Sequence, residues 1–319
     1  MRILALELAR ITEATAIAAA EWIGRRDGKK ADGIAVEVMR TGFNNLDIDG
    51  TVVIGEGERD KAPMLFIGER LGNPDSEHKV DIAVDPLEGT NSVAYGRNEA
   101  MVVMALGGKG DLLQAPDVYM KKIAVGPRAL GVVDINASVA DNIEAVARAL
   151  NKDRSAISVM VLDRERHLDL IQAISATGAK VHTIPDGDVS ACMATCMEES
   201  GIDMYLGVGG APEGVLAASA LRCIGGQMWG RLTFRNDDER GRATRLGISD
   251  FNKIYTMNEL AHGEVMFAAT GVTDGSMLRG VRRWSSGAST QSIIMRSKTG
   301  TVRTISAEHN FSKKSLVED

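Results

Sequence analysis

Residues 80–90, VDIAVDPLEGT, decide how the rest of the chain is interpreted. Apolar residues alternate from Val80 to Val84, a pattern that predicts a buried strand. Pro86 lacks a backbone N–H, and Gly89 tolerates backbone angles that most residues avoid. We therefore expect the strand to end at Pro86 and to be followed by a turn.

Two carboxylates and a hydroxyl, from Asp85, Glu88 and Thr90, leave the end of this strand together. Buried carboxylates repel each other unless a cation or a shared proton lies between them. Oxygen ligands suit hard divalent cations, so the stretch is a candidate site for Mg²⁺ or Mn²⁺. Taken alone, it is equally compatible with a solvated polar turn.

The composition is that of an ordinary globular protein, with 44% hydrophobic and 25% charged residues among 319. This length predicts two domains or lobes. A net charge of −6 argues against a nucleic-acid surface. The three cysteines are too few and unpaired in number for a disulfide framework. There is no apolar run long enough for a membrane span and no signal-peptide pattern, so we expect a cytoplasmic protein.

Helical spacing at residues 2–25 and 29–48 predicts two helices before a strand at 51–54. In the second half, strand and helix patterns alternate, with strands at 157–162, 180–184 and 204–208. Such units predict a parallel, doubly wound sheet, whose ligands bind where the strands end. The polar residues 151–156 make the best internal boundary. We therefore expect an N-terminal metal-binding lobe at 1–155 and a C-terminal α/β sugar-phosphate-binding lobe at 156–319.

Acidic residues gather at the predicted ends of strands and helices. Asp32 stands near the start of the second helix, where a plain N-cap is the alternative interpretation. Glu56 and Glu58 lie between glycines after a strand, where a solvated acidic turn is equally compatible. Asp32, Glu56, Asp85, Glu88 and Glu213 are together too many for one general acid and base, and they suit one to three hard cations around a phosphate.

The loops of the second half offer partners for a second anion and for a sugar. Arg164 and Arg166 carry guanidinium groups that bind phosphate, and Asp186 and Asp188 can accept hydrogen bonds from sugar hydroxyls. The sum of these features is a site for a sugar with two phosphates.

With these residues in place, the chain closely resembles the class II fructose-1,6-bisphosphatases of the GlpX kind over nearly its whole length. The motifs that carry the resemblance are VIGEGE at 53–58, APM at 62–64, residues 80–90, APDVYM at 115–120, PDGD at 185–188 and GGAPEG at 209–214. DPLEGT at 85–90 is also similar to the signature of the wider lithium-sensitive, metal-dependent phosphatases, with Glu88 replacing their second aspartate.

The resemblance implies an α/β protein with the sugar-phosphatase fold, an α+β part and a doubly wound α/β part layered α/β/α/β/α. It implies hydrolysis of the 1-phosphate of fructose 1,6-bisphosphate to fructose 6-phosphate and inorganic phosphate, as in gluconeogenesis and glycerol metabolism. The cofactor would be Mg²⁺ or Mn²⁺, and the protein a homodimer or homotetramer.

The resemblance also implies a role for each site residue. The metal ligands would be Asp32, Glu56, Asp85, Glu88 and Glu213. The substrate would contact Glu88, Gly89, Thr90, Tyr119, Arg164, Glu165, Arg166, Asp186, Gly187, Asp188 and Gly210. Thr90, which would orient the attacking water, would act in catalysis together with Asp85 and Glu213.

One segment departs from the family pattern, which commonly has Gly-Arg-Gly-Asp-Lys before the first metal ligand. Arg26 and Gly28 stand at the second glycine and the lysine of that pattern. If the family lysine touches the site, Lys29 or Lys30 must replace it from a shifted position.

Three other functions share some of these features. A dual enzyme that also accepts sedoheptulose 1,7-bisphosphate would have the same motifs. A dinucleotide-dependent oxidoreductase fails, because Pro212 stands where the phosphate-binding fingerprint needs glycine or alanine. A non-catalytic metal- or sugar-phosphate-binding regulator is disfavoured by the presence of Thr90 and of every carboxylate.

Overall fold

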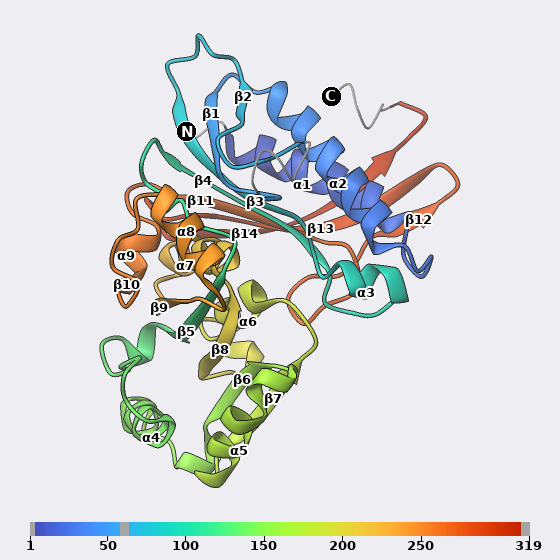
Figure 1. Ribbon diagram of the computed structural model, residues 1–319. Helices are drawn as coiled ribbons and strands as arrows, with labels where there is room; N and C mark the ends of the chain where they lie inside the picture. The colour runs from blue at the N-terminus through green and yellow to red at the C-terminus, as the bar shows by residue number, and fades with distance from the viewer. Residues whose placement is uncertain (1–3, 58–63, 314–319) are drawn as a thin grey trace. The chain divides into compact units, whose positions relative to one another are not determined.

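The computed structural model describes residues 4–57 and 64–313 (Figure 1). The chain divides into two compact units. The first comprises Met1–Leu112 together with Gly263–Asp319, and the second is Leu113–His262.

These units do not follow the expected boundary at residue 155. The strand β5 (Tyr119–Val125) pairs with strands that follow it in sequence, and so it belongs to the second unit. The C-terminal strand β11 (Met266–Gly271) returns to pair with β4 (Met101–Gly108) of the first unit. Because these pairings join distant parts of the chain, local composition does not reveal them.

The first unit is built on an eight-stranded sheet with the order β12-β13-β11-β4-β3-β1-β2, and β14 pairs with β13. Its remaining strands are β1 (Asp49–Ile54), β2 (Arg70–Gly72), β3 (Lys79–Glu88), β12 (Arg282–Trp284), β13 (Gly287–Arg296) and β14 (Thr301–Asn310). Its helices are α1 (Leu4–Ala20), α2 (Gly28–Asn44) and α3 (Thr90–Tyr95).

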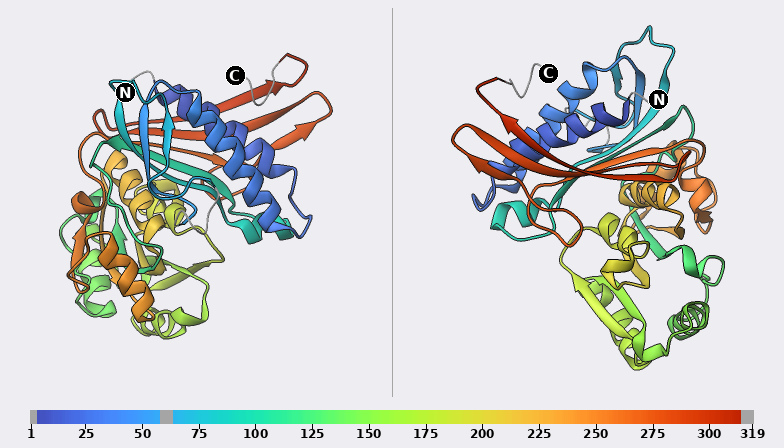
Figure 2. Two further views of the ribbon diagram at one scale, coloured as in Figure 1. Left: turned by 45° about the horizontal axis from the view of Figure 1, so that its top comes forward. Right: turned by 180° about the vertical axis from the view of Figure 1, so that it is seen from behind.

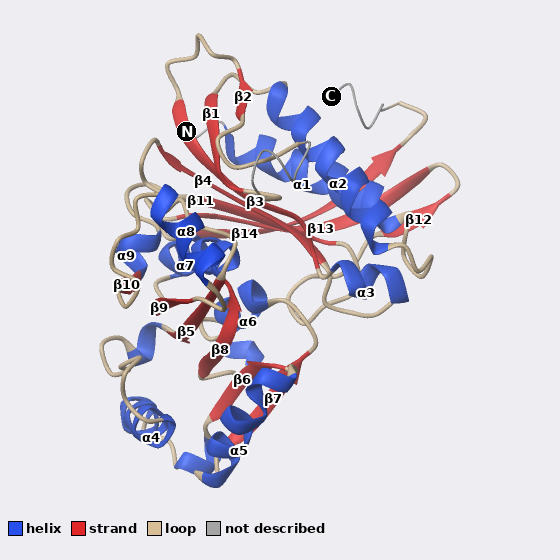
Figure 3. Ribbon diagram, viewed as in Figure 1, coloured by secondary structure: helices blue, strands red, loops and turns tan. Residues whose placement is uncertain are grey.

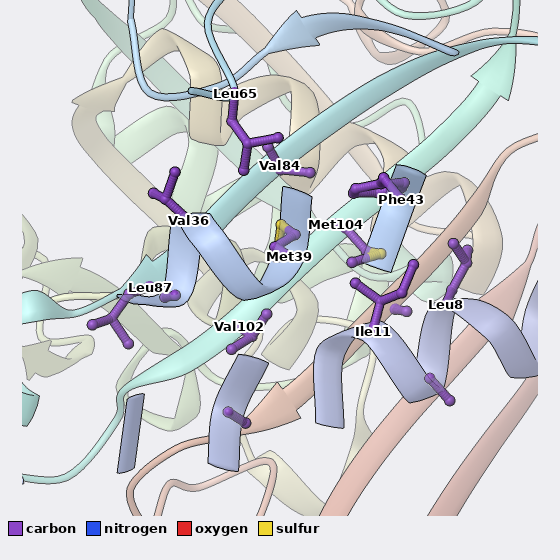
Figure 4. Packing of buried hydrophobic residues seen from close by; sticks show 14 of the residues in the cluster. Leu8, Ile11, Val36, Met39, Phe43, Leu65, Val84, Leu87, Val102 and Met104 are labelled. Atoms are coloured by element: carbon purple, nitrogen blue, oxygen red, sulfur yellow. The ribbon is translucent and has the colours of Figure 1, made fainter. Parts of the chain in front are cut away.

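Helices α1 and α2 lie side by side on one face of this sheet (Figure 2). Leu8 and Ile11 of α1 and Met39 and Phe43 of α2 point toward the strands, where Met104 and other β3 and β4 residues meet them (Figure 4). Because each helix buries one apolar face against the sheet, its apolar residues recur at helical spacing, which is why the sequence predicted both helices.

The strand β3 continues through Pro86, contrary to the expectation that it ends there. Its pairing with β4 shifts register between Asp85 and Glu88, so Pro86 lies in an irregularity. A proline is tolerated within a sheet at a bulge, because its missing N–H is not needed there. The strand therefore ends at Glu88, and Gly89 follows with a φ of 89°.

The second unit is built on a six-stranded sheet with the order β10-β9-β5-β8-β6-β7 (Figure 3). Its remaining strands are β6 (Ser158–Leu162), β7 (Lys180–Ile184), β8 (Met204–Gly210), β9 (Gln227–Thr233) and β10 (Ile254–Thr256). Its helices are α4 (Val139–Leu150), α5 (Leu168–Ala176), α6 (Asp188–Ala194), α7 (Ala211–Ile224), α8 (Asp237–Arg245) and α9 (Met257–Leu260).

The predicted strand and helix alternation is confirmed here, and the chain is of the α/β class. The parallel part of the sheet is limited to β8-β6-β7, because β5 and β9 pair antiparallel. Residues of α4 and α5 share a core with one face of the sheet, and α7 contacts the face that carries Met120. Among the described residues, none of the helices is long and apolar enough to cross a membrane.

Candidate active site

In the first unit, the predicted residues lie at the ends of α2, β1 and β3. Asp85 and Glu88 stand at the end of β3, and Glu88 is buried with an exposed fraction of 4%. Thr90 is the first residue of α3, directly after Gly89. The N–H of Leu87 donates to Oδ1 of Asp85 over 3.1 Å, which fixes this carboxylate within the irregular part of the strand.

Asp32 lies in the second turn of α2 and is not its N-cap. Asp27 caps this helix, with its side chain accepting from the N–H of Lys30 over 3.0 Å. Asp32 is half-buried, and burial raises the pKa of its carboxyl group. The cap interpretation is therefore wrong, and the carboxylate is left for another role.

The segment that departs from the family pattern lies against α3. The N–H of Arg26, which has a φ of 61°, donates to the carbonyl of Ala94 over 2.8 Å. A Cβ on Gly28 would lie 3.1 Å from the carbonyl oxygen of Thr90. Glycine at position 28 thus allows the start of α2 to approach Thr90 closely, which a lysine would hinder.

Glu56 follows β1 and is half-buried, and its N–H donates to the carbonyl of Leu65 over 2.9 Å. Glu58, Ala62 and Pro63 of the quoted motifs lie outside the described residues.

In the second unit, Tyr119 begins β5 and lies between two cations. The guanidinium groups of Arg166 and Arg235 each lie 4.8 Å from the centre of its ring. Nε of Arg166 also donates to the carbonyl of Val208 over 2.8 Å. Tyr119 and Arg166 were predicted from the sequence, whereas Arg235, which stands in a charged stretch without a motif, was not.

The loop before α6 pairs its acids with basic residues. Asp186 lies 3.5 Å from Arg164. Burial raises the pKa of Asp186, and the charge of Arg164 opposes this shift. Gly187, with a φ of 93°, is the N-cap of α6, and the buried Asp188 forms an ion pair with Lys122. Glu165, by contrast, is exposed at the start of a short 3₁₀ helix, Glu165–His167.

Glu213 lies in the first turn of α7, with its carboxylate folded over Gly210, the N-cap residue. Oε2 of Glu213 is buried and has no hydrogen-bond partner within residues 4–57 and 64–313. Burial and the charge of Asp188 raise the pKa of Glu213 to about 7, while Lys122 opposes the shift.

Lys122 is the second residue near the predicted site that was not predicted from the sequence. Burial lowers its pKa, but the charges of Asp188 and Glu213 more than offset this effect, so the pKa of Lys122 is raised. One signal in the sequence could have indicated that Lys122 is buried. Alternation along β5 puts it on the same face as the apolar residues Met120 and Ala124.

His167 is a structural residue. It is buried, its Nδ1 lies 2.8 Å from the carbonyl of Leu162, and its Nε2 accepts from the N–H of Val208 over 2.8 Å. Nδ1 must therefore carry the proton of the neutral ring. Burial lowers the pKa of His167, in keeping with this neutral form.

No group of three or more His, Cys, Asp and Glu side chains in the described parts of the chain is placed to hold a metal ion. The four predicted ligands in the first unit thus do not form such a group by themselves. The donors nevertheless suit a hard divalent cation, because all are carboxylates and Oε2 of Glu213 is buried without a hydrogen bond.

Comparison with known proteins agrees with the resemblance. The sequence model of the glpX-encoded bacterial fructose-1,6-bisphosphatases matches residues 2–309. The chain is 44% identical to the D-fructose 1,6-bisphosphatase class 2/sedoheptulose 1,7-bisphosphatase 2 of Acaryochloris marina, over 97% of this chain and 96% of the relative. It is 43% identical to the fructose-1,6-bisphosphatase 1 class 2 of Escherichia coli K12, over 98% and 97%. The chain therefore belongs to the family of glpX-encoded bacterial fructose-1,6-bisphosphatases.

Proposed function

We propose that this protein hydrolyses the 1-phosphate of fructose 1,6-bisphosphate and releases fructose 6-phosphate and inorganic phosphate. The observation that carries the proposal is that the family match at residues 2–309 includes every predicted site residue. The relatives from Acaryochloris marina and Escherichia coli, which are 44% and 43% identical to this chain, are both named as fructose bisphosphatases.

Mg²⁺ or Mn²⁺ would be held by Asp32, Glu56, Asp85, Glu88 and Glu213. When bound, such ions neutralise phosphate charge and lower the pKa of water. The hydroxyl of Thr90 orients the water that attacks the phosphorus, and the backbone of residues 88–90 holds the phosphate oxygens. The bond from phosphorus to the sugar oxygen then breaks, and that oxygen leaves with a proton that the attacking water gives up.

The second unit orients the sugar. Arg164, Arg166 and Tyr119 bind the 6-phosphate, and the loop at 186–188 with Gly210 binds the sugar hydroxyls. Arg235, 4.8 Å from the centre of the Tyr119 ring, adds a further cation to this group. Fixing the distant phosphate lowers the entropy cost of placing the 1-phosphate for attack.

A second substrate has specific support. Relatives from Acaryochloris marina and from Synechococcus sp. strain JA-2-3B'a(2-13), each 44% identical, are named for both fructose and sedoheptulose bisphosphatase activity. We therefore include sedoheptulose 1,7-bisphosphate as the alternative substrate. A cytoplasmic location, expected from the sequence pattern, and a homodimer or homotetramer, implied by the resemblance, remain predictions.

The test is phosphate release from purified protein stripped of metal and then supplied with Mg²⁺ or Mn²⁺. Fructose 1,6-bisphosphate, sedoheptulose 1,7-bisphosphate and inositol 1-phosphate are compared. Metal-dependent release from fructose 1,6-bisphosphate supports the proposal, and equal release from both bisphosphates makes the protein a dual enzyme. Release from inositol 1-phosphate alone, or from none of the three, would overturn it.

A further inference from the structure

Lys122 is a charged residue in the interior of the second unit. It occupies the middle of β5, and its side chain has an exposed fraction of 0%. Its neighbour Lys121 points to the opposite face, is exposed and donates to the carbonyl of Ile135 over 3.0 Å. A buried ammonium is costly unless it is paired, so the partners of Lys122 explain its position.

These partners are two carboxylates that belong to the predicted site. Nζ of Lys122 forms an ion pair with Oδ2 of Asp188, the first residue of α6. The charge of Glu213, in the first turn of α7, also acts on Lys122. One lysine from the sheet therefore joins the starts of two helices that carry site residues.

The backbone around this group accommodates it. A Cβ on Gly209 would overlap Oδ2 of Asp188 and lie 3.2 Å from Nζ of Lys122. A Cβ on Gly214 would lie 3.5 Å from Cε of Lys122 and 2.6 Å from Sδ of Met120. Two glycines of the motif at 209–214 thus provide the space that the ion pair fills.

Stability alone does not account for this arrangement. Replacing a buried ion pair by apolar residues of similar volume is often neutral or stabilising, because desolvation cancels much of the attraction. An unpaired Asp188, however, would be free to change rotamer or to bind water. The pair therefore restricts where the Asp188 carboxylate can lie.

We propose that Lys122 is a positioning residue, which holds Asp188 in the orientation that binds the sugar and balances the adjacent charge of Glu213. This inference rests on the proposed role of the loop at 186–188 in binding the sugar. It assigns to Lys122 no contact with the substrate. Its effect on binding must therefore pass through Asp188.

The experiment is a double-mutant cycle of Lys122→Met, Asp188→Asn and the combined variant, with Lys121→Met as the matched control on the same strand. The affinity for fructose 6-phosphate is measured by calorimetry in metal-free buffer, and the thermal unfolding midpoint is measured in parallel. Because metal is absent, the result does not depend on the proposed metal ligands.

We expect Lys122→Met and Asp188→Asn each to weaken binding by at least about tenfold, the effect of losing a hydrogen bond to a charged group. The combined variant should bind no more weakly than Asp188→Asn, and Lys121→Met should stay within about twofold of wild type. Additive losses in the combined variant, or wild-type affinity in Lys122→Met, would overturn the proposal.

If Lys122→Met does not fold, Asp188→Asn and the combined variant, which removes both charges of the Lys122–Asp188 pair, still decide the question. Equal affinities in these two support positioning, and a further loss in the combined variant contradicts it. If the wild-type protein binds fructose 6-phosphate but releases no phosphate from the bisphosphate, the proposed function is wrong. The coupling between Lys122 and Asp188 can still be measured in that case.

Discussion

The two units differ in the charges of the residues predicted to meet the substrate. In the first unit these charged residues are Asp32, Glu56, Asp85 and Glu88, which are all acids. In the second unit, acids alternate with cations. Asp186 lies 3.5 Å from Arg164, and Asp188 forms an ion pair inside the protein.

This difference indicates a division of work. In the proposed site, the second unit would supply its own positive charge for an anionic group, through the two arginines that lie 4.8 Å from the centre of the Tyr119 ring. The acids of the first unit would repel a phosphate, so they need cations from solution before a phosphate can approach. Metal should therefore control turnover far more than it controls recognition of the sugar phosphate.

Removing metal should have the largest effect. Chelation is expected to reduce phosphate release from fructose 1,6-bisphosphate to background, because the acids then face the 1-phosphate without a counter-charge. The affinity for fructose 6-phosphate, measured by calorimetry, should change less than about threefold, since the arginines remain. A parallel loss of both quantities would contradict the division, and restored turnover on adding Mg²⁺ or Mn²⁺ is the control.

Asp85→Asn should come next. It keeps the shape of the side chain and its hydrogen bond from Leu87 but removes one proposed ligand charge. Phosphate release should fall by about 100-fold or more, with an unchanged unfolding midpoint. Asp75→Asn, at an exposed position outside the predicted site, serves as the matched control. Normal turnover in Asp85→Asn would remove this residue from the metal site.

The cations of the second unit should affect binding more than rate. Arg166→Ala and Arg235→Ala are each expected to raise KM about tenfold or more, with a smaller effect on kcat, since each loses a charged contact to the distant phosphate. Arg154→Ala, which breaks an exposed pair with Glu144, is the control. A fall in kcat at constant KM would place these arginines in the chemical step instead.

The altered segment before Asp32 gives a smaller test of the first unit. Lys29 stands three residues before Asp32 on α2, a spacing that puts both on one side of the helix, whereas Lys30 does not share it. Lys29→Met should therefore lower kcat/KM by about threefold to tenfold, and Lys30→Met by less than twofold. Losses below twofold in both variants would mean that neither lysine replaces the family residue.

Much of the fold could be predicted, because its signals are local. Strand patterns at residues 157–162, 180–184 and 204–208 located β6, β7 and β8, because each strand lies within one short segment. The unit boundary was missed because it depends on Met266 pairing with Leu106, about half of the chain away. The continuation of β3 through Pro86 was missed because a bulge is a property of two strands.

The site was predicted where residue type and motif coincide, and missed where a residue acts through tertiary neighbours. Two adjacent lysines suggest an exposed strand, yet Lys122 becomes interior once Gly209 and Gly214 leave room for it. Arg235 stands in a polar stretch, and only the fold brings it to Tyr119. The assembly of the five acids around metal remains a prediction.

The smallest expected effect concerns the framework behind the arginines. His167 holds Leu162 and Val208 together as a neutral ring, and its pKa in the folded protein is lowered from 6.5. Protonation would remove its acceptor for Val208, so its stabilising contribution is complete above pH 6.5 and is lost as the pH falls below that value.

His167→Leu should cost about 1–3 kcal/mol of unfolding free energy at pH 8 and less at pH 5. His182→Leu, at an exposed position on β7, is the matched control for the loss of an imidazole. If the cost of His167→Leu is the same at pH 5 and pH 8, the ring does not titrate with folding, and its role is packing alone.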